Sequence, residues 1–87
     1  MCVPKSMFTP DYEHLIELMA EIRREAGVTQ VDLAAALGKL QSFVSKIENG
    51  ERRLDLIEMI AVADALKVAP STVLSRLEKR ISRQVRI

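Results

Sequence analysis

The stretch GVTQVDLAAALGKLQSFVSKIENGERR, residues 27–53, decides the fold of this chain. Its first half begins with Thr29, whose hydroxyl can cap a helix, and closes with Gly38, which suits the left-handed conformation that ends one. A second helical segment runs from Gln41 to Asn49, and Gly50 ends it. Residues 27–53 therefore predict two short helices that meet at a tight turn.

Three more helices are expected on either side of this pair. The first begins at Thr9 and Pro10, the fourth at Asp55, and the fifth at Pro70, because hydroxyl, carboxylate and proline residues favour helix starts. Apolar residues recur at helical spacing in all five segments, which predicts one buried stripe on each. In chain order, the predicted inward-facing residues are Tyr12, Leu15, Met19, Ile22 and Ala26; Leu33, Ala34 and Leu37; Val44 and Ile47; Leu56, Met59, Ile60, Ala63 and Leu66; and Val73, Leu74, Leu77 and Ile81.

Size and composition agree with an all-α domain. A chain of 87 residues is expected to form one core, and its composition of 48% hydrophobic but only 3% aromatic residues favours packed helices. Neither a signal peptide nor a membrane span is expected, because the apolar runs are short. The single cysteine, Cys2, has no partner for a disulfide, so we expect a cytoplasmic protein.

Charge is unevenly placed along the chain, although the net charge is only +1. Residues 11–38 carry six acidic and two basic residues, whereas residues 39–53 carry four basic and two acidic ones. Residues 76–87 carry five basic residues (Arg76, Lys79, Arg80, Arg83 and Arg86) and one acidic residue. The two basic segments could meet phosphates while the acidic segment faces away, although charge alone is equally compatible with solvated helix faces.

The residues quoted above resemble the Cro and repressor, or Xre-type, helix-turn-helix family. The resemblance rests on Gly27 to Gln30, Leu33–Ala34, Leu37–Gly38 and residues 41–53, and it extends over roughly residues 15 to 74. It implies a compact five-helix domain of the lambda-repressor type at residues 10–75. An N-terminal arm at residues 1–9 and a basic extension and tail at residues 76–87 lie outside it. The implied activity is regulation of transcription, most simply repression, through double-stranded DNA.

Helix geometry indicates which residues of the second short helix could read DNA. The major groove admits one α-helix, and about 100° per residue places Val44, Ile47 and Glu48 inward. The predicted base-reading residues are Gln41, Ser42, Ser45 and Lys46. Gln41 is the first candidate, because its amide can pair with adenine through two hydrogen bonds.

Other residues are expected to contact phosphates or to support the reading helix. Lys39, Asn49, Arg52 and Arg53 are the predicted phosphate or groove contacts, with Phe43 either beside a thymine methyl group or covering the core edge. The family resemblance implies that Gln30 holds a phosphate and braces Gln41. It also implies that Arg23 forms a structural ion pair with Glu48.

The sequence departs from the family pattern at three positions. Leu40 stands where a capping residue or proline is usual, which leaves the exact start of the reading helix open. Lys67 replaces a glycine after the fourth helix, and Ala69 replaces a capping hydroxyl before the fifth. The first two changes predict an uncapped helix start and a strained helix end.

One reading helix contacts too few base pairs to select a site, so a homodimer on a two-fold operator is expected. Leu77 and Ile81 are the candidate dimer surface, and the alternative is that they cover the first helix within one subunit. A protein-interaction module such as an antitoxin is the rival function. Enzyme activity, a metal site and a cofactor are not expected, because one histidine, His14, and one cysteine supply neither a catalytic set nor a ligand cluster.

Overall fold

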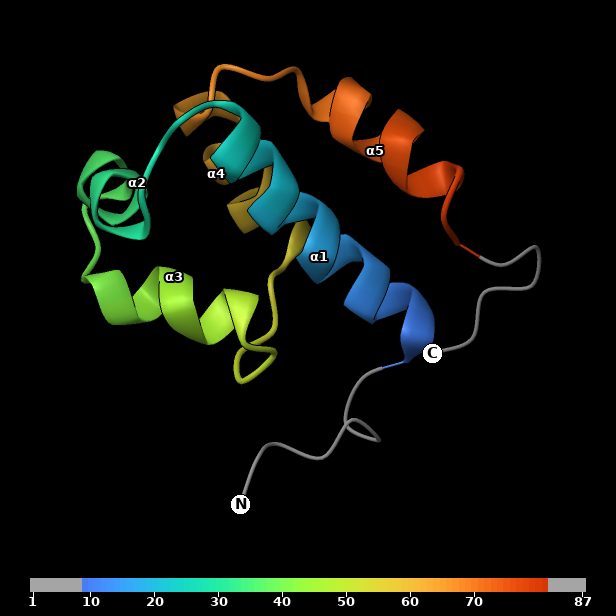
Figure 1. The fold of residues 1–87 in the computed structure, drawn as a ribbon, viewed down its shortest axis with the longest axis horizontal. Coiled ribbons are helices and arrows are strands. Elements are labelled where there is room, and N and C mark those ends of the chain that lie inside the picture. Colours follow the sequence, from blue (N-terminus) through green and yellow to red (C-terminus); the bar gives the residue numbers. More distant parts are fainter. Residues whose placement is uncertain (1–8, 82–87) are drawn as a thin grey trace.

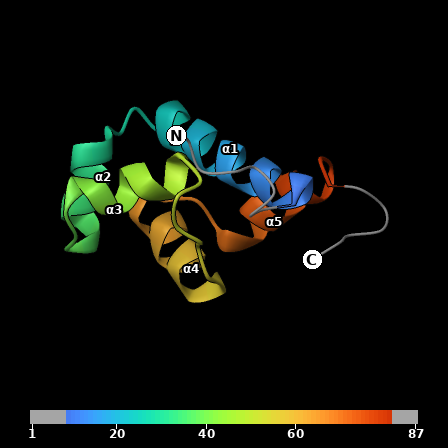
Figure 2. The same ribbon diagram turned by 90° about the horizontal axis from the view of Figure 1, so that it is seen from below.

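The computed structural model describes residues 9–81, and within this range the chain folds into five helices and no strand. The helices are α1 (Pro10–Glu25), α2 (Gln30–Leu37), α3 (Gln41–Glu48), α4 (Leu56–Ala65) and α5 (Pro70–Glu78). The long helix α1 runs through the centre; α5 lies along one side of it, while α2 and α3 lie together at one end (Figures 1 and 2). The predicted all-α, five-helix fold is confirmed. Cys2, Arg83 and Arg86 lie outside the described residues.

Three helices begin where the sequence predicted, and each first turn has a side-chain cap. The hydroxyl oxygens of Thr9 and Thr29 accept hydrogen bonds from the backbone N–H groups of Tyr12 (3.1 Å) and Asp32 (3.0 Å). At α4, Asp55 and Glu58 form a reciprocal capping box, with N···O distances of 2.7 and 3.0 Å. These contacts satisfy N–H groups that a helix start otherwise leaves without a partner.

The core joins all five helices, with Leu18, Ile22 and Val73 among its fully buried side chains. Most of the predicted inward residues are buried or pack against this core. The prediction was wrong for Ala26, Leu56 and Leu74, which are exposed. Ala26 caps the end of α1, and Leu54, just before α4, takes the buried place expected of Leu56. The stripe of α1 also proved wider than predicted, since Ile16, Leu18 and Ala20 are buried.

Each of the three departures from the family pattern has a structural consequence at a helix end. Leu40 and Ala69 precede α3 and α5 without a side-chain cap. Lys67 has a φ of 61°, so a residue with a side chain occupies the left-handed conformation that glycine adopts more easily. The helix α3 nevertheless begins at Gln41, as expected.

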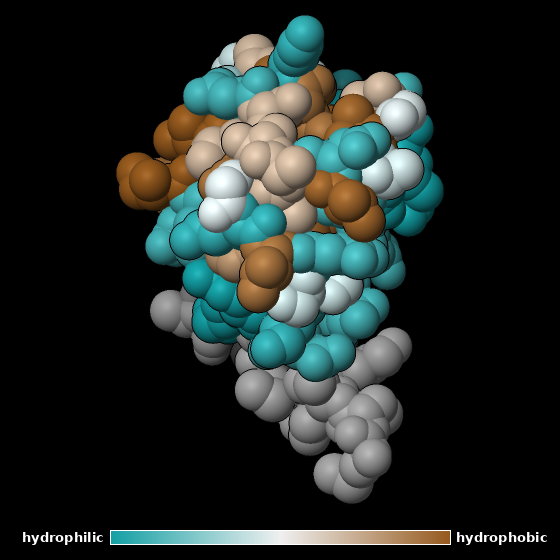
Figure 3. Space-filling view, turned by 90° about the vertical axis from the view of Figure 1, so that its left-hand side faces the viewer, coloured by the Kyte–Doolittle hydropathy of each residue, from teal (hydrophilic) through white to brown (hydrophobic). Residues whose placement is uncertain are grey.

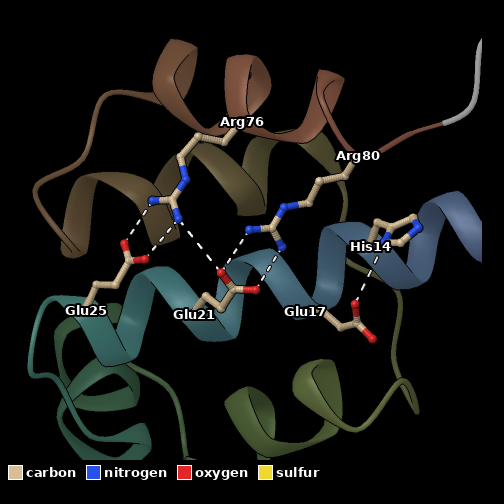
Figure 4. Close-up of polar contacts among 6 residues, drawn as sticks. All are labelled: His14, Glu17, Glu21, Glu25, Arg76 and Arg80. Carbon is tan, nitrogen blue, oxygen red and sulfur yellow. Dashed lines mark hydrogen bonds and ion pairs between the residues drawn. The ribbon is translucent and has the colours of Figure 1, made fainter.

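Part of the predicted basic surface is neutralised within the domain. Arg76 on α5 makes paired hydrogen bonds of 2.9 Å with Glu25, and Arg80 makes paired bonds of 2.8 Å with Glu21 (Figure 4). These arginines hold the pKa values of the Glu25 and Glu21 carboxyl groups below their usual range. The expectation that this segment meets phosphates is therefore corrected for Arg76 and Arg80, which bind the acidic face of α1 instead.

No helix within residues 9–81 has the length and hydropathy needed to cross a membrane.

Candidate nucleic-acid interface

A tight turn sets α3 beside α2. Gly38 ends α2 with a φ of 68°, a conformation in which any other residue would be strained. The N–H groups of Gly38 and Lys39 donate to the carbonyl oxygens of Ala35 (3.1 Å) and Ala34 (2.9 Å). Because these bonds close the end of α2, the chain changes direction within three residues and enters α3 at a defined angle.

The helix α3 buries one face and exposes another. Val44 and Ile47 are buried in the core, as predicted. The exposed side chains of α3 and its C-terminal end are Gln41, Ser42, Lys46 and Asn49. Ser45 is half-buried, and its hydroxyl donates to the Ser42 carbonyl oxygen at 3.3 Å.

The dimensions and polarity of α3 suit a DNA groove. An α-helix with its side chains is about 10–12 Å in diameter, which fits the major groove of about 12 Å, and the eight residues of α3 extend for about 12 Å along its axis. In Figure 3, which views the α2 and α3 end, apolar residues gather in the upper part, where α2 lies, and the part below is mostly hydrophilic. Because Gln41, Ser42 and Lys46 are exposed, the polar face of α3 is open to a ligand.

A nearly buried carboxylate holds α1, α2 and α3 together. The Glu48 carboxylate accepts hydrogen bonds from Arg23 Nε (2.7 Å), Arg23 Nη2 (3.1 Å) and Gln30 Nε2 (2.9 Å). Arg23 Nη1 also donates to the Val28 carbonyl oxygen at 2.8 Å. The side chains of Arg23 and Glu48 are only 12% and 10% exposed. This network, which we call the Glu48 network, fixes the end of α3 against its neighbours.

The network corrects the expected partner of Gln30. The resemblance implied that Gln30 braces Gln41, but its amide nitrogen binds Glu48. Gln30 is the first residue of α2 and is half-buried. It therefore supports the C-terminal end of α3, where Glu48 lies, and not the N-terminal end, where Gln41 lies. Gln41 itself stands exposed at the first position of α3.

Arg52 also differs from its expected role as a phosphate clamp. Its Nη1 and Nη2 atoms donate to the two carboxylate oxygens of Glu58 at 2.9 and 2.7 Å. This contact, together with the capping bond from the Asp55 backbone, lowers the pKa of Glu58 to about 2. The sequence did not indicate this pair, because a contact between a loop residue and a helix residue six positions later has no periodic signal.

Arg53 is exposed, but it lies against the start of α1. Its guanidinium carbon is 4.6 Å from the centre of the Tyr12 ring, and the Tyr12 hydroxyl accepts a 2.6 Å hydrogen bond from the Leu54 backbone. Tyr12 therefore ties the loop after α3 to α1. The sequence predicted Tyr12 as a core residue and missed this support.

Phe43 stands at the border between the buried and exposed faces of α3. It is half-buried and packs against the core. Two cations also lie over its ring, Lys39 Nζ at 5.4 Å and the guanidinium carbon of Arg52 at 4.6 Å from the centroid. Phe43 thus packs against the core edge with part of its ring still exposed, among groups that were expected to contact DNA, so the two predicted roles are compatible and the thymine contact stays a prediction.

The two residues predicted to form a dimer surface lie largely inside the subunit. Leu77 is half-buried against the core, and Ile81 is half-buried after the end of α5. Since α5 packs along α1, these positions favour the alternative, in which both residues cover α1 within one subunit. Large exposed apolar side chains occur elsewhere, at Val31, Leu40, Leu56, Ile57 and Leu74.

No cluster of three or more metal-binding side chains occurs within residues 9–81. His14 lies on the surface of α1, where its Nδ1 atom is 3.8 Å from Glu17 (Figure 4).

Comparison with known proteins identifies relatives for most of the chain. A solved Xre-family-like protein from Pseudomonas syringae is 45% identical and superposes with a TM-score of 0.80, covering 90% of this chain and 95% of that one. The restriction-modification controller protein C.AhdI from Aeromonas hydrophila is 28% identical, with a TM-score of 0.67 and coverage of 75% and 98%.

Sequence comparison agrees with these structures. An uncharacterised HTH-type transcriptional regulator, y4dJ, from Sinorhizobium fredii is 38% identical over 50 residues. That match spans 58% of this chain and 65% of the relative, just under two thirds of its length. The family model described as Helix-turn-helix matches residues 19–73, which include α2, α3 and α4. The chain therefore belongs to the Xre family of helix-turn-helix proteins.

Proposed function

We propose that this protein is a transcriptional repressor that binds a specific double-stranded DNA site as a homodimer. The observation that carries the proposal is the position of α3. Its apolar face and Glu48 are anchored in the domain, while Gln41, Ser42, Lys46 and Asn49 are exposed on it and at its end. A rigid helix with one open polar face is what direct readout in the major groove requires.

The site residues divide into two groups with different expected effects. Gln41, Ser42, Ser45 and Lys46 read base edges, with Gln41 at the first position of the helix. Lys39, Asn49 and Arg53 contact phosphates, and so does Gln30 at the first position of α2. The y4dJ and controller relatives support a regulatory role. Such a role requires the compartment that holds the chromosome, so we place the protein in the cytoplasm.

Selected DNA fragments provide the test. Sites are selected from random genomic DNA, and binding is then measured at several salt concentrations for the parent, Gln41→Ala and Arg53→Ala. Gln41→Ala should lose about 1–3 kcal/mol of discrimination at one base position. Arg53→Ala should weaken binding evenly and reduce the salt slope by about 1.

Lys79→Ala is the matched control. Lys79 is an exposed base after α5, and because α5 packs along α1 on the side away from α3 (Figure 1), we assign Lys79 no phosphate contact, although the sequence grouped it with the basic segment. Lys79→Ala should leave both the base discrimination and the salt slope of binding nearly unchanged. Equal losses on every sequence from Gln41→Ala and Arg53→Ala would refute the division of roles. Absence of any preferred fragment, together with co-purification of a tight protein partner, would favour the antitoxin-like alternative.

We place the dimer surface at the first turn of α4. Leu56 and Ile57 are 61% and 72% exposed, and they follow the loop that leaves α3. A second copy at this position would keep both reading helices close to one two-fold axis. Leu74 on α5 is also exposed, but α5 lies across α1 from α3 (Figure 1).

Sedimentation of the protein with operator DNA measures how many subunits bind one operator, and variants at each surface show which of the two forms the dimer interface. Ile57→Ser should weaken the dimer, whereas Leu74→Ser, the matched control, should leave it intact. The reverse result would move the interface to α5, and one parent subunit per operator would refute the homodimer.

A further inference from the structure

Phe43 is held in place by a chain of contacts that begins on another helix. The Arg52 guanidinium lies over the ring at 4.6 Å, and Glu58 at the start of α4 binds that guanidinium through both carboxylate oxygens. We call this chain, Glu58 to Arg52 to Phe43, the Arg52 bridge. It connects the first turn of α4 to the border of the exposed face of α3.

Each part of the Arg52 bridge is fixed by more than one contact. Arg52 Nη1 also donates to the Arg53 carbonyl oxygen at 2.7 Å, so the planar group is held at its edge as well as over the ring. Glu58 is in turn held by the capping box with Asp55. The Arg52 and Glu58 side chains are 38% and 26% exposed, so the bridge is partly shielded from water.

The surroundings of Phe43 suggest what a fixed ring would do. It directly follows the exposed Gln41 and Ser42, and Lys39 Nζ lies 5.4 Å from its centroid. A phenylalanine ring has only two rotatable side-chain bonds, so a planar cation on it restricts its orientation. An apolar ring at the border of a groove-reading face fits the methyl group of thymine, the one apolar feature of the major-groove edge.

We propose that Phe43 is a specificity-determining residue that contacts a thymine methyl group, and that Glu58 is a positioning residue that orients Phe43 through Arg52. This inference rests on the proposed function, since it assigns a partner to one residue of the same face. Glu58 and Arg52 then influence which base is preferred without reading a base themselves.

Replacing thymine by uracil in the selected operator tests the contact, because uracil lacks only the methyl group. At one operator position, the parent should bind the thymine duplex about fourfold more tightly, the value expected for burial of one methyl group. Phe43→Ala should reduce this ratio to about one. Glu58→Gln and Arg52→Lys should also lower the ratio, although neither is at the expected base contact.

The variants are chosen to separate orientation from folding and charge. Glutamine can still serve in a capping box, so Glu58→Gln keeps the start of α4 and removes the ion pair. Arg52→Lys keeps the positive charge but loses the planar fork. Glu51→Gln makes the same charge change as Glu58→Gln at an exposed loop position, and its thymine-to-uracil ratio should equal that of the parent.

Three outcomes would overturn the inference while the parent still binds its operator with specificity. These are a parent without any position sensitive to uracil, a Glu58→Gln variant that keeps the full ratio, and equal loss in Glu51→Gln. Circular dichroism of each variant checks that the helices remain. Failure of the proposed function would look different, because the parent itself would then select no operator.

Discussion

Glu48→Ala should be among the most destabilising single changes at the interface. It would leave Arg23, whose side chain is only 12% exposed, with the Val28 carbonyl oxygen as its remaining partner, and it would also free the Gln30 amide. Removing one partner of a nearly buried pair costs about 3 kcal/mol of unfolding free energy. For a domain of this size, that loss lowers Tm by roughly 12–24 °C.

Urea unfolding followed by circular dichroism measures this loss, and two further variants define its origin. Glu51→Ala removes an exposed carboxylate nearby and should change stability by less than about 0.5 kcal/mol. The double variant Arg23→Met with Glu48→Leu should recover most of the lost stability, because it removes the uncompensated charge. A cost below about 1 kcal/mol for Glu48→Ala, or no recovery in the double variant, would refute the idea that a buried charge pair holds α3.

Three further predictions concern helix ends and the contact between α1 and α5. Leu40→Ser should add a cap to α3 and stabilise the domain by about 1 kcal/mol, visible as a higher urea midpoint; an unchanged midpoint would argue against the missing cap. Lys67→Gly should relieve the left-handed conformation and stabilise the domain by about 1 kcal/mol in the same assay, and a lower urea midpoint would contradict the strain assigned to Lys67. Arg76 and Arg80 lower the folded-state pKa values of Glu21 and Glu25. The contribution of these two carboxylates to the free energy of unfolding is therefore present above their ordinary pKa near 4.5, and it is lost as the pH falls through the lower folded-state pKa values. Stability between pH 5 and pH 3 should therefore fall less in a Glu21→Gln, Glu25→Gln variant than in the parent, and equal slopes would contradict this assignment.

Much of the local structure follows from the sequence, because it depends on residues a few positions apart. A hydroxyl or carboxylate before a helix can bond an N–H group three residues later, which is why the starts at Thr9, Thr29 and Asp55 were predictable. Helical periodicity likewise identified Val44 and Ile47 as the buried residues of α3, and so identified its opposite, polar face.

The long-range partners were decided only by the tertiary structure. Arg76 and Arg80 both read as basic surface residues in the sequence, yet they bind glutamates of α1 that lie 51 and 59 residues away. Nothing in local spacing indicates such a pairing, because it depends on how two helices approach each other after the core has formed. Helix ends and buried faces are therefore local properties of this chain, whereas the availability of an arginine to a ligand depends on which carboxylates packing brings within reach.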